Sequence, residues 1–189
     1  MRAYPTQYIT SWELRDGTPV TIRPIRPEDE PMMVNFHKTL SEESVHFRYF
    51  GLIKLSQRIE HKRLSHICSD DYDQDIALVV EHKGPHRRQH EILGVARLGK
   101  LAGETEAEFA IVISDPWQRR GLGTHLLTLL VEIGRKEKLR RIFSHILSDN
   151  FAMQHVFRKL GFELHHDVSE GEVRAELRLP SDDQHLEAP

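Results

Sequence analysis

One stretch of the sequence, residues 111–127, constrains the fold more than any other. It begins with an apolar run, passes through Ser-Asp-Pro-Trp-Gln-Arg-Arg-Gly-Leu-Gly, and then places apolar residues one helical turn apart. The apolar run is typical of a buried strand, and the later spacing predicts an amphipathic helix from Leu122 to Lys138. A strand that leads through a glycine-containing turn into a long helix predicts an α/β domain.

The rest of the chain predicts further strands and helices around this unit. Short alternating or apolar runs predict strands at residues 20–23, 76–82, 92–98, 106–113, 141–147, 163–168 and 173–179, of which 76–82, 92–98 and 106–113 form an antiparallel meander. Helical spacing predicts helices after Pro27, at residues 45–50, 57–67 and 152–160. We therefore expect a mixed, mostly antiparallel sheet flanked by helices.

The length of 189 residues predicts one domain with extensions. Residues 1–18 are polar and show no sustained period, so we expect an N-terminal extension ahead of a domain at residues 19–180. Residues 181–189 are polar and are expected to form a flexible tail.

The composition excludes several classes of partner. The chain has 26 Lys and Arg against 29 Asp and Glu, and a net charge of −3 predicts no general attraction to nucleic acid or membranes. No apolar run approaches the roughly 18 residues that span a bilayer, and the start lacks an apolar leader segment, so we expect a cytoplasmic protein. The single cysteine, Cys68, fits a reducing compartment and is expected to be buried rather than nucleophilic.

The glycine-containing turn predicts an anion site. Gly121 and Gly123 allow backbone angles and close approach that a Cβ would obstruct, and the free N–H groups of the following helix point to the same place. Residues 118–141 carry a net charge of +5, and we expect Arg119 and Arg120 to face a diphosphate, with the later basic residues at a solvated helix end. The pattern matches neither a P-loop nor a dinucleotide fingerprint.

This turn and several segments elsewhere in the chain carry a resemblance to one known family. Gln118-Arg-Arg-Gly-Leu-Gly123 resembles the acyl-CoA loop, Arg/Gln-x-x-Gly-x-Gly/Ala, of the GCN5-related N-acetyltransferase (GNAT) family. Ser148-Asp-Asn150 and Phe157-Arg-Lys-Leu-Gly-Phe162 resemble a later segment of that family. Residues 22–30, 40–50 and 107–112 resemble the acetyltransferase domain of bacterial protein lysine acetyltransferases. The resemblance covers residues 20–179.

This resemblance implies a single GNAT-like domain with splayed central strands and acetyl-CoA as co-substrate. The implied reaction is direct transfer of an acetyl group to an amine, with a protein lysine side chain as the first choice of acceptor. A small-molecule amine acceptor and a non-catalytic acyl-CoA sensor are the alternatives. The oligomeric state is left open.

The same resemblance implies which residues bind the cofactor. Strand backbone groups would contact the pantetheine arm, the glycine turn would hold the diphosphate, and Asn150 would hydrogen-bond the arm while also serving as a helix N-cap. The expected cofactor-binding residues are Ile111, Ile113, Gln118, Arg119, Arg120, Gly121, Leu122, Gly123, Thr124 and Asn150. The histidines are scattered without supporting carboxylates, so no metal is expected.

An attacking amine must lose a proton, and Glu108 is the expected catalytic base. It lies in an apolar strand where a carboxylate has no packing value, and partial burial would raise its pKa toward neutrality. The family has a strand glutamate with this role at this place. Alternatively, Glu108 points outward and pairs with Arg97, or a bulge in the strand makes Glu106 or Glu104 the base.

The general acid is not assigned. Where many family members have a tyrosine that protonates the departing thiolate, this chain has Phe157, which has no proton to donate. Tyr49 and Ser148 are considered as substitutes. A thiolate needs little help to leave near neutral pH, because thiols ionise near a pKa of about 8.5.

Overall fold

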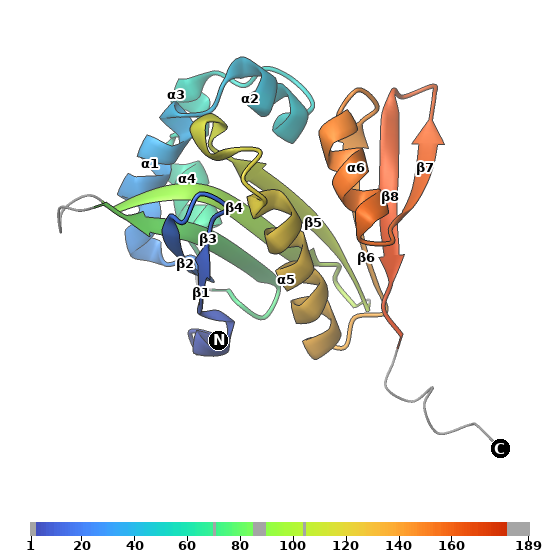
Figure 1. Ribbon diagram of the computed structural model, residues 1–189, viewed down its shortest axis with the longest axis horizontal. Coiled ribbons are helices and arrows are strands. Elements are labelled where there is room, and N and C mark those ends of the chain that lie inside the picture. The colour runs from blue at the N-terminus through green and yellow to red at the C-terminus, as the bar shows by residue number, and fades with distance from the viewer. Residues whose placement is uncertain (1–2, 70, 85–89, 104, 181–189) are drawn as a thin grey trace.

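The computed structural model describes residues 3–69, 71–84, 90–103 and 105–180 (Figure 1). The strands are β1 (Thr10–Glu13), β2 (Pro19–Pro24), β3 (Asp75–Lys83), β4 (His90–Lys100), β5 (Glu106–Ile113), β6 (Arg141–Leu147), β7 (Glu163–Asp167) and β8 (Glu172–Arg178). The α-helices are α1 (Glu30–Lys38), α2 (Glu42–Tyr49), α3 (Leu55–Arg58), α4 (His61–Ile67), α5 (Leu122–Lys136) and α6 (Phe151–Lys159). Short 3-10 helices lie at Thr6–Tyr8, Pro27–Asp29 and Asp115–Trp117.

The strands form one sheet in the order β1-β2-β3-β4-β5-β6-β8-β7, in which β5 and β6 are parallel and the other neighbours are antiparallel. The β5–β6 pairing is short and runs from Glu106 opposite Arg141 to Glu108 opposite Phe143. Beyond it the two strands diverge, and Figure 1 shows β6 and β8 separating from β5. The expected mixed, mostly antiparallel sheet with splayed central strands is confirmed.

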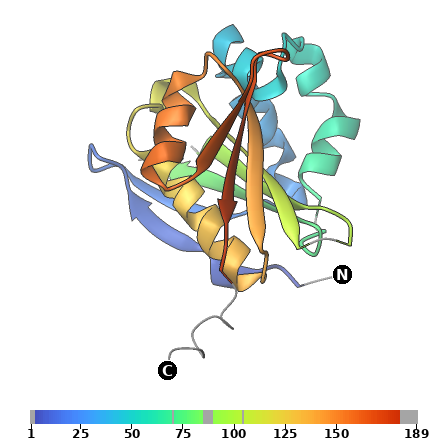
Figure 2. The same ribbon diagram turned by 90° about the vertical axis from the view of Figure 1, so that its right-hand side faces the viewer.

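Helices cover both faces of the sheet, on opposite sides in Figure 2. The apolar stripe of α5 packs on one face, where Leu126, Leu127 and Leu130 are fully buried in a cluster that continues to Phe157 of α6. The other face is covered by α1, α2 and α4, whose buried side chains include Phe36 of α1. Strand β5 therefore has a packed layer on each side.

Most expected elements are found within two residues of their predicted ends. Strands β5 and β6 match the predicted ranges, and α5 ends at Lys136 rather than at Lys138, which has a left-handed φ of 56°. The single helix expected at residues 57–67 is wrong, because extended backbone at Glu60 separates α3 from α4.

Part of the expected N-terminal extension, residues 10–13, forms strand β1 of the sheet. Strand β1 pairs with β2, the side chains of Tyr8 and Leu14 are buried in the main core, and the Trp12 ring stacks on His125 of α5 with centroids 4.2 Å apart. The four residues of β1, which alternate between half-buried and exposed, give too short a pattern to predict a strand. The expected tail at residues 181–189 lies outside the described residues.

None of the helices in the described ranges combines the length and the apolar character needed to cross a bilayer.

Candidate active site

A cavity of about 440 Å³, here called the β5–β6 cavity, lies where the two central strands diverge. Its walls come from β5, β6, the glycine turn, the start of α6, α2 and the β1–β2 hairpin. Its volume lies within the range of about 300–1,000 Å³ that small-molecule sites occupy. Of the residues expected to bind a cofactor, those that line it are Ile111, Ile113, Gln118, Arg119, Gly121, Gly123, Thr124 and Asn150.

The glycine turn owes its shape mainly to Gly121. This residue has a φ of 87°, and a Cβ there would approach Arg15 Nε to 3.2 Å, so both conformation and space favour glycine. Gly123 lies within α5, where a Cβ would make an ordinary 3.5 Å contact with Ile113 Cδ1. Of the two glycines, only Gly121 thus has a backbone conformation that favours glycine.

The start of α5 offers backbone donors beside the cavity. Gly121 precedes the helix and supplies no capping side chain, and Gly123 and Thr124 of the first turn line the cavity wall. Uncapped N–H groups at a helix start attract anions. Arg119 adds an exposed guanidinium to the same wall.

Arg120 and Leu122 are placed differently from the rest of the turn. Arg120 forms an ion pair with Asp16, donates a hydrogen bond to the Pro116 carbonyl at 3.0 Å, and lies over the Trp117 ring at 4.6 Å. Leu122 is buried in the core with 1% of its surface exposed. The side chain of Arg120 is thus engaged outside the cavity wall, which sequence reasoning could not foresee because Asp16 is remote in the chain.

The backbone of β5 alternates between its two neighbours. The Glu106 carbonyl accepts a hydrogen bond from Leu101 N, and Ser114 N donates to the Leu93 carbonyl. The backbone N–H and C=O groups of even-numbered residues therefore point towards β4. The backbone groups of odd-numbered residues point towards β6. One of them, the Ile113 carbonyl, accepts a hydrogen bond from the Gln118 side chain at 3.0 Å. The peptide groups of Ile111 and Ile113 consequently border the opening between the strands.

Glu108 stands at the point where β5 and β6 separate. Its side chain lines the β5–β6 cavity and is 54% exposed, and its Oε1 lies 3.6 Å from Nδ1 of His145 on β6. The side chain is thus partly buried, and the divergence of the strands at this residue leaves the rest of it open to solvent.

Arg97 and Glu106, which enter the alternatives to a catalytic Glu108, have other partners. Arg97 forms its ion pair with Asp75 instead of Glu108, and Glu106 pairs with Arg141 at 2.6 Å. The register between β4 and β5 is continuous, so no bulge changes the alternation. Glu104 lies outside the described residues.

Neither substitute for the general acid lies in this cavity. Tyr49 lines a different cavity, and Ser148 is exposed outside the β5–β6 lining. Phe157 is completely buried at the cavity wall, with its ring 5.6 Å from that of Phe109. The hydroxyl side chains that do line the cavity are Ser44, Thr124 and Ser144.

Asn150 both caps helix α6 and lines the cavity. Its Oδ1 accepts a hydrogen bond from Met153 N at 3.2 Å, which confirms the expected N-cap of α6. The residue is 8% exposed and also lines the β5–β6 cavity. The cap holds the side chain in place at the cavity wall.

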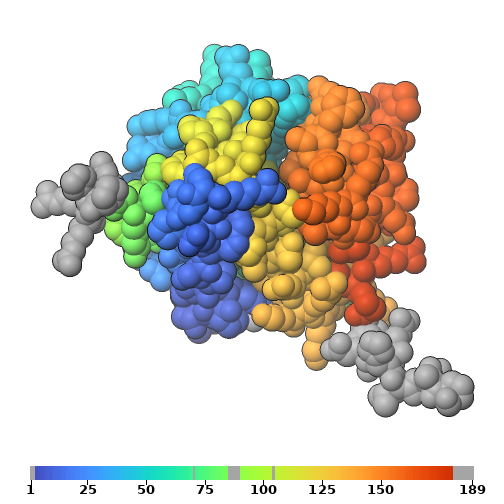
Figure 3. All heavy atoms as spheres, viewed as in Figure 1, coloured from blue at the N-terminus to red at the C-terminus, as the bar shows by residue number. Residues whose placement is uncertain are grey.

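Arg15 and His145 are among the cavity residues that the sequence did not predict. Arg15 reaches the glycine turn from the β1–β2 hairpin, which lies beside that turn in Figure 3, and no pattern marked the hairpin. His145 faces the same way as Phe143, the register partner of Glu108, so the strand alternation of β6 could have identified it once the pairing was known.

The described side chains give little support to a metal site or to a nucleophilic cysteine. In the described part of the chain, Glu163, His165 and Glu176 form one group of possible ligands, but Glu176 Oε2 lies 3.3 Å from Arg141 and 3.6 Å from Arg174. These guanidinium charges oppose a bound cation. Burial, together with nearby acidic groups, raises the pKa of the Cys68 thiol to about 12, so this cysteine is not a nucleophile.

The geometry agrees with the similarity of the chain to known proteins. Residues 20–163 match the model of the family described as "Acetyltransferase (GNAT) domain". The chain is 32% identical over 150 residues to "Acetyltransferase PA5475" of Pseudomonas aeruginosa, covering 79% of this chain and 77% of that protein.

Solved structures show the same fold. The GNAT domain of S. lividans PAT aligns with a TM-score of 0.82 and 26% identity, covering 94% of this chain and 100% of that domain. PaiA N-acetyltransferase from Thermoplasma acidophilum, solved in complex with coenzyme A, aligns with a TM-score of 0.66 and 15% identity, covering 85% and 99% of the two chains. The chain belongs to the GNAT acetyltransferase family and is an N-acetyltransferase.

Proposed function

We propose that this enzyme transfers the acetyl group of acetyl-CoA to the side-chain amine of a protein lysine. The observation that carries the proposal is the β5–β6 cavity, which has the glycine turn and uncapped α5 start at one part of its wall and the exposed carboxylate of Glu108 at another. A diphosphate donor group and a reacting amine thus have separate places in one cavity. Similarity to the GNAT domain of S. lividans PAT supports this choice of acceptor.

In the proposed reaction, the neutral amine attacks the thioester carbonyl, the new C–N bond forms, and the C–S bond breaks to release the CoA thiolate. Glu108 accepts the proton of the amine, directly or through water, because its exposed carboxylate lies beside the opening. The N–H groups at the edge of β5, including those of Ile111 and Ile113, are placed to stabilise the oxyanion. No general acid is needed in this scheme.

In the proposed complex, different residues bind different parts of acetyl-CoA. The N–H groups from Gly121 to Thr124 and the guanidinium of Arg119 hold the diphosphate, and the β5 edge and Asn150 contact the pantetheine arm. Gln118, which donates to the Ile113 carbonyl and to Ser44 Oγ, would position the turn next to α2. The proposed compartment is the cytoplasm, where a single reduced cysteine such as Cys68 is ordinary.

Incubation of the purified protein with acetyl-CoA and a cell lysate tests the acceptor. We expect mass spectrometry to find newly acetylated lysines that are missing when acetyl-CoA is omitted. An empty lysine map together with acetylated small amines would replace the protein acceptor by a small molecule. Cofactor binding without transfer to any amine would instead favour an acyl-CoA sensor.

Charge reversal at the two arginines of the turn should have unequal effects. Arg119→Glu is expected to weaken acetyl-CoA binding by about tenfold or more, because it places a carboxylate at the wall proposed for the diphosphate. Arg120→Glu should weaken binding less, since that guanidinium is already engaged by Asp16.

The matched pair makes this test specific, because both variants change the net charge equally. Isothermal titration calorimetry with acetyl-CoA measures the two dissociation constants. Equal losses would show that only the overall charge of the turn matters, and no loss in Arg119→Glu would remove this residue from the proposed site.

A further inference from the structure

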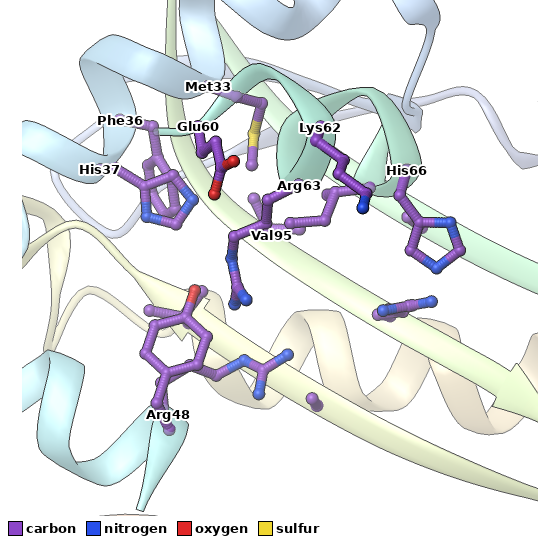
Figure 4. Close-up of a pocket in the computed structure, with 15 residues that line it drawn as sticks. Met33, Phe36, His37, Arg48, Glu60, Lys62, Arg63, His66 and Val95 are labelled. Atoms are coloured by element: carbon purple, nitrogen blue, oxygen red, sulfur yellow. The ribbon is translucent and has the colours of Figure 1, made fainter. Parts of the chain in front are cut away.

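A second cavity, of about 530 Å³, lies beneath α1, α2 and α4, on the face of the sheet away from α5 (Figure 4). Its lining includes three arginines, Arg48 of α2, Arg63 of α4 and Arg97 of β4, and it is called the arginine cavity below. Its floor is formed by small and apolar side chains of three strands, Ala77, Val95, Ala110 and Val112. This combination of cationic walls and an apolar floor suits an anionic group attached to a carbon chain.

The charges of this cavity are only partly balanced. Arg97 is paired with Asp75, but in the described parts of the chain neither Arg48 nor Arg63 has a carboxylate partner. Instead, each guanidinium lies 5.1 Å from the centroid of the Tyr49 ring. Burial lowers the pKa of Arg48, with neighbouring arginine charges acting in the same direction.

Other lining groups leave the cavity positive. Lys62 and His66 lie along one side in Figure 4, and Glu60 is the one acidic residue among the described lining residues. Two partly buried cationic side chains that face the same cavity without an acidic partner repel each other, and a bound anion would stabilise both.

Buried polar atoms at the same place independently indicate a ligand. His37 is 1% exposed and lines the cavity, and within the described ranges neither of its ring nitrogens has a hydrogen-bond partner. The buried Nε of Arg63 also lacks one. In Figure 4, His37 and Arg63 both lie at the cavity, next to Glu60 and Phe36. Unsatisfied buried polar groups are uncommon in folded proteins and call for an explanation.

The arginine cavity adjoins the proposed transfer site. Arg48, Ala110 and Val112 line both cavities. Glu108 and Ala110 point to the same face of β5 and are about 7 Å apart along the strand. The charge of Glu108 also acts on Arg48 and Arg97. A molecule whose amine lies at Glu108 can therefore place another of its groups in the arginine cavity.

We propose that the arginine cavity binds a carboxylate of the acceptor, supplied by an Asp or Glu residue close to the target lysine. This inference rests on the proposed function, because it assumes that the amine is acetylated beside Glu108. Guanidinium groups bind carboxylates through paired, charge-assisted hydrogen bonds. Among the described residues the buried Nε of Arg63 has no hydrogen-bond partner, and Arg48 lines the cavity beside it. The enzyme would thus select lysines that have an acidic neighbour.

Matched peptides test the proposal. Each pair contains one lysine and differs only by Glu or Gln at one position, and the pairs move this position along both sides of the lysine. For at least one pair, we expect the wild-type enzyme to show about tenfold or higher kcat/KM for the Glu peptide. Arg63→Gln should remove most of this preference while leaving kcat/KM for the Gln peptide nearly unchanged, because Arg63 lies outside the β5–β6 lining.

Two further variants test whether the loss of positive charge alone explains the result. Arg135→Gln removes one positive charge from the exposed end of α5 and should keep the preference. Arg63→Lys keeps the charge, loses the planar fork, and should give an intermediate preference. Equal use of the Glu and Gln peptides in every pair, or an undiminished preference in Arg63→Gln, would overturn the inference.

A binding measurement separates this inference from the proposed function. Fluorescence anisotropy gives the affinity of each labelled peptide for the enzyme saturated with CoA. If no peptide is acetylated but the Glu peptide binds more tightly and Arg63→Gln abolishes the difference, carboxylate recognition stands and the protein acceptor fails. Free lysine and lysine amide identify the other source of the carboxylate, since selective acetylation of free lysine would assign it to a small acceptor. Equal affinities throughout would overturn the inference.

Discussion

Replacing Glu108 with glutamine should lower kcat for acetyl transfer by about 10²–10⁴-fold near pH 7, the usual contribution of a positioned general base. The amide keeps the shape of the side chain but accepts no proton, and the exposed position means that the substitution should change stability by less than about 0.5 kcal/mol. Acetyl-CoA affinity should stay nearly the same, because the glycine turn lies elsewhere along the cavity wall. Steady-state kinetics and calorimetry measure the two effects.

Glu106→Gln is the matched control for this experiment. Glu106 lies on the same strand and the same face as Glu108, but it is engaged by Arg141 at 2.6 Å. We expect this variant to retain most of its turnover. A collapse in Glu106→Gln with normal activity in Glu108→Gln would exchange the roles, and normal turnover in both would direct attention to His145, 3.6 Å from Glu108.

Stability should fall as the pH decreases below about 6.5, in part because of His37. Burial, assisted by the nearby charges of Arg58, Arg63 and Arg48, lowers the pKa of this histidine to about 4. Between an unfolded value of about 6.5 and that folded value, the unfolded state binds a proton that the folded state does not. The resulting loss of unfolding free energy grows as the pH falls and approaches about 3 kcal/mol near pH 4.

His37→Leu should remove this contribution, so that its unfolding free energy declines less steeply over the same pH range. Urea denaturation of both proteins at several pH values between about 7.5 and 4 gives the difference, in which the other titrating groups cancel. Parallel curves for the two proteins would show that His37 titrates alike in the folded and unfolded states. His46→Leu, at a partly exposed position on α2, is a suitable second reference.

Local patterns were sufficient for most of the scaffold. The apolar period of α5 extends over four turns, and β5 and β6 match their expected limits. The chain turns at Glu60 without a glycine or proline, so the break between α3 and α4 had no local signal. Strand β1 was missed for a related reason, since its four residues depend on pairing with β2.

The site was predictable in its residue types but less so in its side-chain directions. The glycine turn and Asn150 line the cavity as their motifs indicate, because backbone geometry dictates those positions. Arg120 turns to Asp16, and the divergence of β6 exposes Glu108; both depend on segments distant in the chain. The arginine cavity had no sequence signal, since its arginines come from two helices and a strand that only the tertiary fold brings together.

The β1–β2 hairpin has a practical consequence for anyone who trims this protein. The family match starts at residue 20, so a recombinant fragment cut there would lose β1 with Trp12, and also Arg15 at the glycine turn. It would leave β2, with the fully buried Ile22, as a bare hydrophobic edge. Unprotected edge strands recruit other chains, so such a fragment should be prone to aggregation before its catalysis could be measured.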